Sequence, residues 1–164
     1  MRHTWTIAVF LFAAVAALPV SAQTRAVVLD FELIDEMHDP ATREGDRSRL
    51  EKVSARFPEA LRNCGTLAVL PPPKPVIELL ASQIAYVHQC NGCAEDIAKA
   101  AGADIVVFTW VQKVSNLIIN LNAEAQDAGG RTLDVRSVDM RGNTDTSWLR
   151  AADALAKRLC ERVK

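Results

Sequence analysis

The sequence predicts a single α/β domain with a mixed sheet of about five strands, in the order strand, helix, strand, helix, strand, strand, strand, helix. Apolar runs typical of strands alternate with segments of helical spacing over the first part of the chain. The last three strands follow one another without a helix, which argues against a doubly wound nucleotide-binding fold. A glycine-containing turn between two alternating segments indicates that the last two strands form a hairpin.

The first 22 residues have the pattern of a cleavable signal peptide. Basic residues come first, an apolar run from Ile7 to Leu18 follows, and small residues precede position 23. The run has about twelve residues, whereas a membrane span needs about twenty. We therefore expect export through a cleavable signal peptide and a single periplasmic domain over residues 23–164. The first cysteine is Cys64, so a lipid anchor at the cleavage site is not expected.

The first predicted strand, Arg25–Leu33, combines an apolar run with alternation at its end. An acidic segment over residues 35–46 contains proline and glycine, and we expect it to be an exposed loop. A helix is expected from Arg47, kinked or restarted at Pro58 and ending near Gly65. Its apolar side chains at helical spacing are Leu50, Val53, Phe57 and Leu61.

The second predicted strand, Thr66–Leu70, leads into a stiff proline run. A helix follows from Pro75, because proline suits the first helical turn. Its expected core side chains are Val76, Leu79, Leu80, Ile84 and Val87. A shorter helix, Ala94–Ala101, ends at Gly102 in the usual position of a terminating glycine.

The continuous apolar run within Ala103–Val111 predicts a strand at the centre of the sheet, covered on both faces. The hairpin strands are expected from Leu117 to about Ala125 and from Arg131 to about Met140. A final helix begins near Thr144 or Asp145, because either side chain can cap it. Its apolar face consists of Trp148, Ala152, Leu155, Leu159 and Val163.

The chain has four cysteines, an even number that favours disulfides in an oxidising compartment. Three connectivities are possible. Cys90 and Cys93 stand close together in a C-N-G-C segment, and sequence distance favours a bridge between them. That bridge leaves Cys64 to pair with Cys160, which requires the first long helix and the last helix on one face of the sheet.

The C-N-G-C segment has alternatives to a structural disulfide. A thioredoxin-like redox site has this spacing, but such sites follow the first strand of their fold. A haem attachment site requires a histidine where Ala94 stands. A zinc site needs two more ligands, and only His88 and Cys64 are candidates. A thiol-disulfide or metal-handling protein that uses Cys90 and Cys93 is therefore the alternative functional prediction.

Composition and motifs exclude several classes of function. The formal net charge is −1, and this balance argues against nucleic acid or an anionic membrane surface as the main partner. The acidic segment lacks the alternate-residue spacing of an EF-hand calcium loop. Neither His38 nor His88 accompanies a nucleophile motif, and no glycine-rich phosphate loop occurs. We expect neither a cofactor nor an enzymatic activity.

Three polar segments at the ends of predicted elements indicate a binding rim. They are residues 110–116, 139–143 and 144–148. The candidate rim residues are Lys113, Asn116, Arg141, Asn143, Asp145 and Trp148. The alternative is local: the asparagines shape turns, Thr144 or Asp145 caps a helix, and Arg141 forms an ion pair with Asp139 or Asp145.

The segments D-F-E-L, C-N-G-C, V-Q-K-V-S-N-L-I and R-G-N-T-D-T-S-W resemble a family of small exported proteobacterial proteins classed as a domain of unknown function. The likeness covers nearly the whole of residues 23–164. It implies that the C-N-G-C pair is shared by the family and that Cys64 pairs with Cys160. The family position after the second cysteine is often acidic, whereas this chain has Ala94.

The strand order is more remotely similar to the N-terminal domain of the Tol-Pal translocation protein and related envelope lipoproteins. That likeness implies assembly or docking in the cell envelope. Together with the rim, it predicts a non-enzymatic periplasmic accessory protein that docks onto another periplasmic or envelope protein through Lys113, Asn116, Arg141, Asn143 and Trp148.

Overall fold

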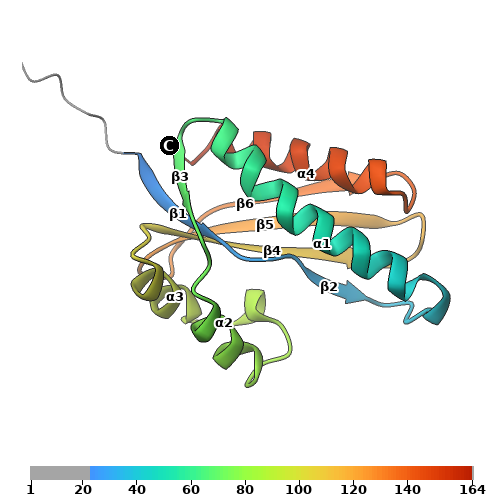
Figure 1. The fold of residues 1–164 in the computed structure, drawn as a ribbon, viewed down its shortest axis with the longest axis horizontal. Coiled ribbons are helices and arrows are strands. Elements are labelled where there is room, and N and C mark those ends of the chain that lie inside the picture. The colour runs from blue at the N-terminus through green and yellow to red at the C-terminus, as the bar shows by residue number, and fades with distance from the viewer. Residues whose placement is uncertain (1–22, 164) are drawn as a thin grey trace, which may run out of the picture.

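A computed structural model describes residues 23–163, which form one mixed α/β domain (Figure 1). The signal peptide expected over residues 1–22 lies outside the described residues. The elements are β1 (Thr24–Val28), β2 (Glu32–Asp35), α1 (Pro40–Asn63), β3 (Leu67–Leu70), α2 (Lys74–Ala81), the short 3₁₀ helix η1 (Val87–Gln89), α3 (Cys93–Ala101), β4 (Ile105–Lys113), β5 (Ile119–Asp127), β6 (Thr132–Met140) and α4 (Asp145–Cys160).

Six strands form a single sheet in the order β3-β1-β4-β5-β6, and β2 pairs with β4 beyond the end of β1. Strand β1 is parallel to both β3 and β4, and β2 is also parallel to β4. The pairs β4–β5 and β5–β6 are antiparallel. The predicted fold class is therefore confirmed, with one strand more than expected.

The sheet is covered by helices on both faces (Figure 1). On one face α1 and α4 pack over a core that includes Phe57, Val107, Leu121 and Trp148. On the other face α2, η1 and α3 pack against a smaller core that includes Ile97 and Phe108. Central strand β4 contributes to both cores, as its continuous apolar run predicts.

Helices α1 and α4 run side by side in the same direction, because three links join them in matching order (Figure 1). Arg49 in the first half of α1 bonds to Asp145 at the start of α4, and Arg56 further along α1 bonds to Asp153. At the far ends a disulfide joins Cys64 to Cys160. The starts of both helices therefore lie at the same end of the domain.

The predicted strand Arg25–Leu33 is two strands in the structure, β1 and β2, separated by residues 29–31. Side chains hold backbone groups at this break. The Thr109 hydroxyl donates to the carbonyl of Leu29, and the N–H of Phe31 donates to the Ser54 hydroxyl. The strand is thus interrupted at residues 29–31, and the side chains of Thr109 and Ser54 pair the backbone groups that strand pairing leaves free there.

The expectation that residues 35–46 form an exposed acidic loop is wrong for its second half. Helix α1 begins at Pro40, where Asp39 caps it by accepting a hydrogen bond from the N–H of Ala41 at 2.9 Å. A capping aspartate followed by proline at the first helical position is a helix-start signal, and it outweighs the turn preference of the segment. The helix continues through Pro58 to Asn63.

The helix expected from Pro75 through Val87 is shorter than its apolar spacing predicts. Helix α2 ends at Ala81, and the chain reaches η1 through a non-helical connection. Strand β4 extends to Lys113, two residues beyond its predicted end, and β5 begins at Ile119. Residues 114–118 therefore form the connection between β4 and β5.

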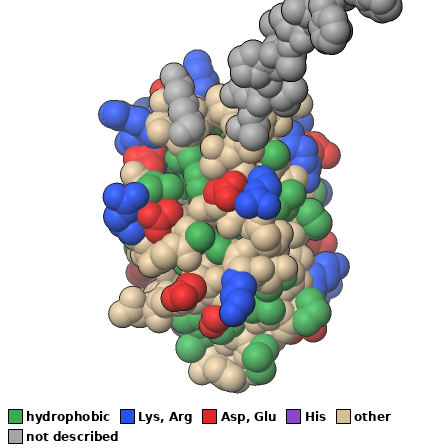
Figure 2. Space-filling model, turned by 90° about the vertical axis from the view of Figure 1, so that its left-hand side faces the viewer, with side chains coloured by type: hydrophobic (Ala, Val, Ile, Leu, Met, Phe, Trp, Pro, Cys, Tyr) green, Lys and Arg blue, Asp and Glu red, His purple; other side chains and the backbone are tan. Residues whose placement is uncertain are grey.

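The end of the domain where β1 begins faces the viewer in Figure 2, and charged side chains of both signs are scattered over it among apolar ones. Arg25 and Asp104 form an ion pair there, at 2.9 Å. Among residues 23–163 no helix is long and apolar enough to span a bilayer.

Candidate functional site

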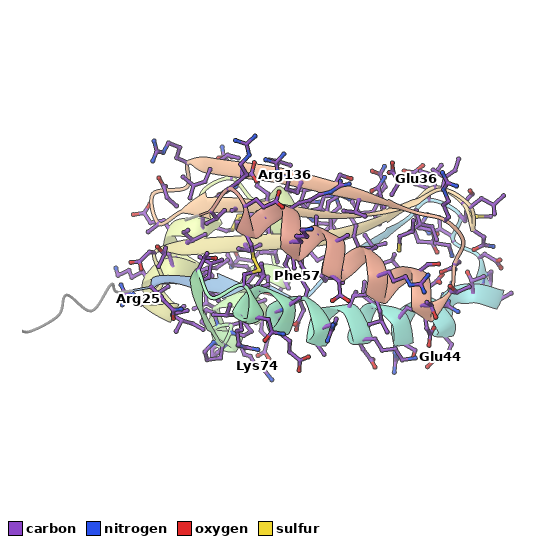
Figure 3. The ribbon with its side chains drawn as sticks, turned by 90° about the horizontal axis from the view of Figure 1, so that it is seen from above. Arg25, Glu36, Glu44, Phe57, Lys74 and Arg136 are labelled. Carbon is purple, nitrogen blue, oxygen red and sulfur yellow. A yellow bond between two sulfur atoms is a disulfide. The ribbon has the colours of Figure 1, made fainter. Side chains whose placement is uncertain are left out.

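Three segments far apart in the sequence meet at the end of the domain opposite Arg25. They are the β4–β5 connection, the start of α1 and the turn before α4. The labelled side chains Glu36 and Glu44 lie at this end in Figure 3, and Arg25 lies at the other. The predicted rim segments belong to this end, because Lys113 closes β4 and residues 141–148 lead into α4.

A buried ion pair lies just beneath this end of the domain. The Lys113 ammonium donates to the Asp46 carboxylate, and both side chains are fully buried. The ammonium also donates to the Thr42 hydroxyl at 2.7 Å, and a carboxylate oxygen of Asp35 lies 3.9 Å away. The pair joins β4 to α1, which are 67 residues apart at this point.

The Asp46 carboxylate accepts two further hydrogen bonds, from Arg49 at 3.1 Å and from the Asn143 amide at 2.7 Å. Asn143 in turn accepts from the indole N–H of the fully buried Trp148 at 2.8 Å. We call Lys113, Asp46, Asn143 and Trp148 the buried network. It connects the end of β4, the first turns of α1 and the first turn of α4.

The network determines the charge of Asp46. Burial raises the pKa of this carboxyl group, but hydrogen bonds from Lys113 and Asn143 and the positive charge of Lys113 lower it by more. The pKa of Asp46 therefore lies below its ordinary value, and the carboxylate is charged at neutral pH. A buried charge is stable only when it is paired and hydrogen-bonded, as it is here.

The six predicted rim residues differ in burial, with two buried, two partly buried and two exposed. The side chains of Lys113 and Trp148 are buried, so they support the surface from below. Asn116 and Asn143 are partly buried and 3.4 Å apart between side-chain oxygen and nitrogen, while Arg141 and Asp145 are exposed. Asp145 forms ion pairs with Arg49 and Lys52, and its pKa is lowered chiefly by the hydrogen bond from Lys52.

The surface also contains apolar side chains that the rim prediction did not include. Leu117 is 78% exposed and Ile118 is 59% exposed, with Val114 and Met37 also exposed nearby. Met37 lies at this end because the N–H of the preceding Glu36 donates to the carbonyl of Lys113. We call Met37, Val114, Leu117 and Ile118 the apolar tip. The sequence pattern predicts Leu117 and Ile118 to lie in the following strand, which begins only at Ile119 in the structure.

A shallow depression of about 430 Å³ lies beside the apolar tip. Its lining combines the start of α1 with the β4–β5 connection and the turn before α4: Ala41, Thr42, Gly45, Arg49, Asn116, Leu117, Gly142 and Asn143. The hydroxyl of Thr144 caps α4 by accepting from the N–H of Ser147 at 3.2 Å. The lining of the depression therefore includes hydrogen-bond donors, such as Arg49 and Asn143, and the exposed side chain of Leu117.

The cysteines are joined as Cys64–Cys160 and Cys90–Cys93. The Cα atoms of Cys64 and Cys160 are 6.4 Å apart, within the limit of about 7 Å for a disulfide. Helices α1 and α4, which carry these two cysteines at their ends, lie on one face of the sheet, as the expected pairing of Cys64 with Cys160 requires.

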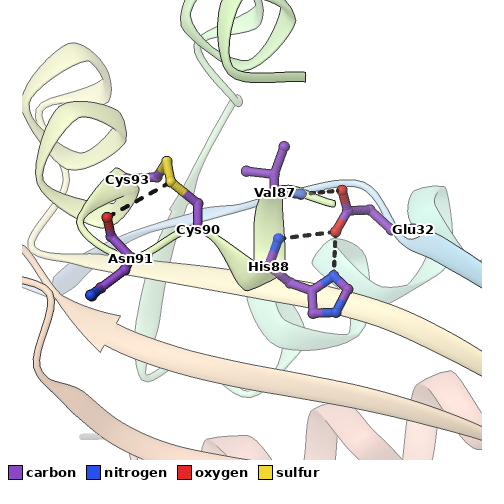
Figure 4. The surroundings of a disulfide bond; sticks show 6 residues. All are labelled: Glu32, Val87, His88, Cys90, Asn91 and Cys93. Carbon is purple, nitrogen blue, oxygen red and sulfur yellow. Dashed lines mark hydrogen bonds and ion pairs between the residues drawn. A yellow bond between two sulfur atoms is a disulfide. The ribbon is translucent and has the colours of Figure 1, made fainter. Parts of the chain in front are cut away.

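His88 is directed away from the C-N-G-C disulfide (Figure 4). Its Nδ1 lies 2.5 Å from a carboxylate oxygen of Glu32, and its ring stacks on Trp110 with centroids 4.6 Å apart. Glu32 also accepts hydrogen bonds from the N–H groups of Val87 and His88. Over residues 23–163 no group of three or more His, Cys, Asp or Glu side chains is arranged to hold a metal ion.

A family model described as "Protein of unknown function (DUF2380)" matches residues 24–159. No curated protein matches the sequence. Solved structures that are similar in fold include the following three. Lipoprotein GNA1162 from Neisseria meningitidis is 18% identical with a TM-score of 0.48, over 86% of this chain and 99% of that chain.

The other two structures are LpoB proteins. LpoB of E. coli is 14% identical with a TM-score of 0.44, over 73% of this chain and 58% of that chain. The C-terminal domain of LpoB from Salmonella enterica is 13% identical with a TM-score of 0.43, over 74% of this chain and 85% of that chain. The remote likeness to the Tol-Pal translocation protein stays a prediction.

Proposed function

We propose that this chain, which belongs to the family described as "Protein of unknown function (DUF2380)", is a non-enzymatic accessory protein that docks onto another protein of the cell envelope. The docking surface is the end of the domain that carries the apolar tip and the depression beside it. The observation that carries the proposal is the exposure of Leu117 and Ile118 directly above the buried network.

The apolar tip has the composition of an interface centre. Leu117 and Ile118 together with Val114 and Met37 expose apolar side chains at one end of a small domain. Contiguous exposed apolar side chains surrounded by polar groups mark interaction sites on soluble proteins. Here the polar surroundings are Asn116, Asn143 and Arg141, which were predicted as rim residues. An apolar centre with a polar rim fits a protein partner.

The surface is held in place before any partner binds. Within the β4–β5 connection the Ser115 hydroxyl accepts from the N–H groups of Leu117 and Ile118, at 3.2 and 3.1 Å. The N–H of Val114 donates to the carbonyl of Ile118 at 3.0 Å. Lys113, the residue before this connection, is fixed in the buried network. Such preorganisation reduces the conformational entropy lost on binding.

The location in the envelope rests on the signal peptide expected over residues 1–22. The alternative function, thiol exchange or metal handling, has no specific support. The Cys90–Cys93 disulfide fits a structural bridge as well as an oxidised exchange pair, and His88 contacts Glu32 and Trp110 instead of the cysteines.

The proposal is tested by affinity capture of the chain from the envelope fraction of cells that express it. Leu117→Asp and Ile118→Asp place a charge on the apolar tip, and Leu133→Asp places one on β6, where Leu133 is also exposed. We expect a partner that copurifies stoichiometrically with the wild type and with Leu133→Asp but is lost from both tip variants. Equal recovery with all four proteins, or recovery of the chain alone from wild type, would contradict the proposal.

A further inference from the structure

A second surface, separate from the apolar tip, lies where the sheet has an open strand position. Strand β3 pairs with β1 and ends at Leu70, opposite Val27. The proline run 71–73 then directs the chain into α2. Beyond the end of β1, the chain continues in line along β4 as β2. Within the described residues no strand pairs with the edge of β2 that faces away from β4.

The backbone of β2 has hydrogen-bonding groups directed to this open position. The N–H of Glu36 donates to the carbonyl of Lys113, so it points toward β4. Successive N–H groups of a strand alternate in direction, so those of Leu33 and Asp35 point to the free edge. The preceding outward N–H, that of Phe31, already donates to the Ser54 hydroxyl of α1. The vacancy therefore begins at Leu33.

Hollows lie on both faces of the sheet beside residues 29–32, directly before the open position, where a strand in line with β3 would pass. On the α2 face a pocket of about 350 Å³ is lined by apolar side chains that include Leu29, Ile77, Ala81 and Phe108. On the α1 face a depression of about 380 Å³ lies between residues 30–31 and the middle of α1. A strand added at the edge would direct alternate side chains into these two hollows.

The charges around the position are mainly negative. Asp30, Glu51 and Glu78 are exposed there, and Lys74 is the exposed cation among the residues that line the two hollows. Electrostatic complementarity therefore favours a basic ligand. The apolar pocket on the α2 face favours an apolar side chain at alternate positions.

We propose that the free edge of β2 binds an extended segment of a partner protein, in which apolar side chains alternate with basic ones, as an added strand in line with β3. The apolar side chains enter the pocket beside α2, and the basic side chains face Glu51 and Asp30 on the α1 side. The main chain of the segment bonds to the outward groups of Leu33 and Asp35.

The test titrates ¹⁵N-labelled protein with the peptide Lys-Leu-Lys-Val-Lys-Leu-Lys. We expect binding that shifts the amide resonances of Leu33 and Asp35 and slows their exchange with solvent. The variant Ala81→Trp fills the pocket from the end of α2 and should weaken binding by about tenfold or more. Leu79→Trp, on an exposed position of the same helix, and Leu117→Asp at the apolar tip should leave binding unchanged.

Two control peptides complete the test. Replacing valine by proline removes a main-chain donor, and replacing lysine by glutamate reverses the charge, so both should bind at least about tenfold more weakly. No binding of the lysine peptide would overturn the proposal. Equal binding of the glutamate peptide, unchanged Leu33 and Asp35 amides, or an unaffected Ala81→Trp variant would overturn it as well. None of these outcomes depends on the apolar tip, so this inference and the proposed function can fail separately.

Discussion

The ammonium group of Lys113 lies against the carboxylate of Asp46, and neither side chain reaches solvent. The pair fixes the end of β4 to the second turn of α1, directly beneath the β4–β5 connection. Because Asn143 and Trp148 extend the same network to α4, three elements meet at one charged centre. The apolar tip begins at Val114, the residue after Lys113, so we expect its geometry to depend on this centre.

Replacing Lys113 by methionine should destabilise the protein by about 3–5 kcal/mol at neutral pH, because it leaves the Asp46 charge buried without its cation. The measurement is the free energy of unfolding from urea titration. Lys113→Met combined with Asp46→Leu should recover much of the loss, since it removes both charges. Lys52→Met, at an exposed pair with Asp145, is the control for loss of a lysine and should have a much smaller effect. Equal effects of Lys113→Met and Lys52→Met would contradict the role of the buried pair.

The loss caused by Lys113→Met should also depend on pH. In the wild type the pKa of Asp46 is below its unfolded value of about 3.9, so its contribution is present above that pH and is lost as pH falls. Without Lys113, burial should raise the pKa above the unfolded value, which reverses the sign. The difference in unfolding free energy between wild type and variant should therefore grow as pH rises from about 3 to 7. A difference independent of pH would show that the two proteins do not differ in the titration of Asp46.

The buried network shows why part of the site could not be predicted from sequence. Asp46 stands in an acidic segment that reads as solvent-exposed, and its partner is 67 residues away on a strand. The start of α1, by contrast, had a local signal in Asp39 and Pro40. The alternation over residues 119–125 predicted a strand, because its period of two is a local property, and its apolar side faces α1 and α4 in the structure.

Non-reducing peptide mapping should recover two disulfide-linked peptides, one with Cys64 and Cys160 and one with Cys90 and Cys93. The Cys64–Cys160 bridge spans a sequence separation of 96 and the Cys90–Cys93 bridge one of 3. In the chain-entropy model the first bridge stabilises the folded state by roughly 4–5 kcal/mol and the second by about 2 kcal/mol. Cys64→Ser with Cys160→Ser should therefore lower the unfolding free energy by more than Cys90→Ser with Cys93→Ser does. Linkage of Cys64 to Cys90 or Cys93 would contradict the pairing and the packing of α1 beside α4.

The ion pair of Arg25 and Asp104 should respond to acid. The hydrogen bonds from the Arg25 side chain and backbone N–H, together with its charge, lower the pKa of Asp104 to about 2. The contribution of this carboxylate is thus present above about pH 4 and is lost as pH falls toward about 2. In Arg25→Gln, an NMR titration should give Asp104 a pKa closer to its ordinary value. The melting temperatures of the two proteins should converge near pH 2, and a gap that persists there would argue against the ion pair as its cause.

Replacing Trp148 by phenylalanine removes the indole N–H that bonds to Asn143 while keeping an aromatic ring in the core. We expect a loss of about 1–3 kcal/mol in the free energy of unfolding, because the Asn143 oxygen loses its donor and the smaller ring packs less completely. A change of the Asn143 side-chain amide resonances should accompany it. Unchanged amide resonances would indicate that the indole is not bonded to Asn143 in solution.

The apolar tip illustrates a different limit of prediction from sequence. Leu117 and Ile118 continue the apolar character of β5, so the alternation alone does not reveal that the strand begins only at Ile119. The Ser115 hydroxyl holds both residues in the connection between strands, where their side chains are exposed. The polar rim residues were recognisable as turn and capping types, whereas the burial of Lys113 and Trp148 beneath them follows from the packing of α1 and α4.

The most direct test of the docking proposal is site-specific photo-crosslinking in living cells, with a photoreactive amino acid at position 117 or, as control, at position 79. Leu79 is exposed on α2, away from the apolar tip. Position 117 should give one discrete crosslinked product with an envelope protein, and Ile118→Asp should abolish that product without lowering the melting temperature of the chain. Position 79 should not give the same product. Identical products from positions 117 and 79, or no product from position 117 in cells where the chain is exported and folded, would contradict docking through this surface.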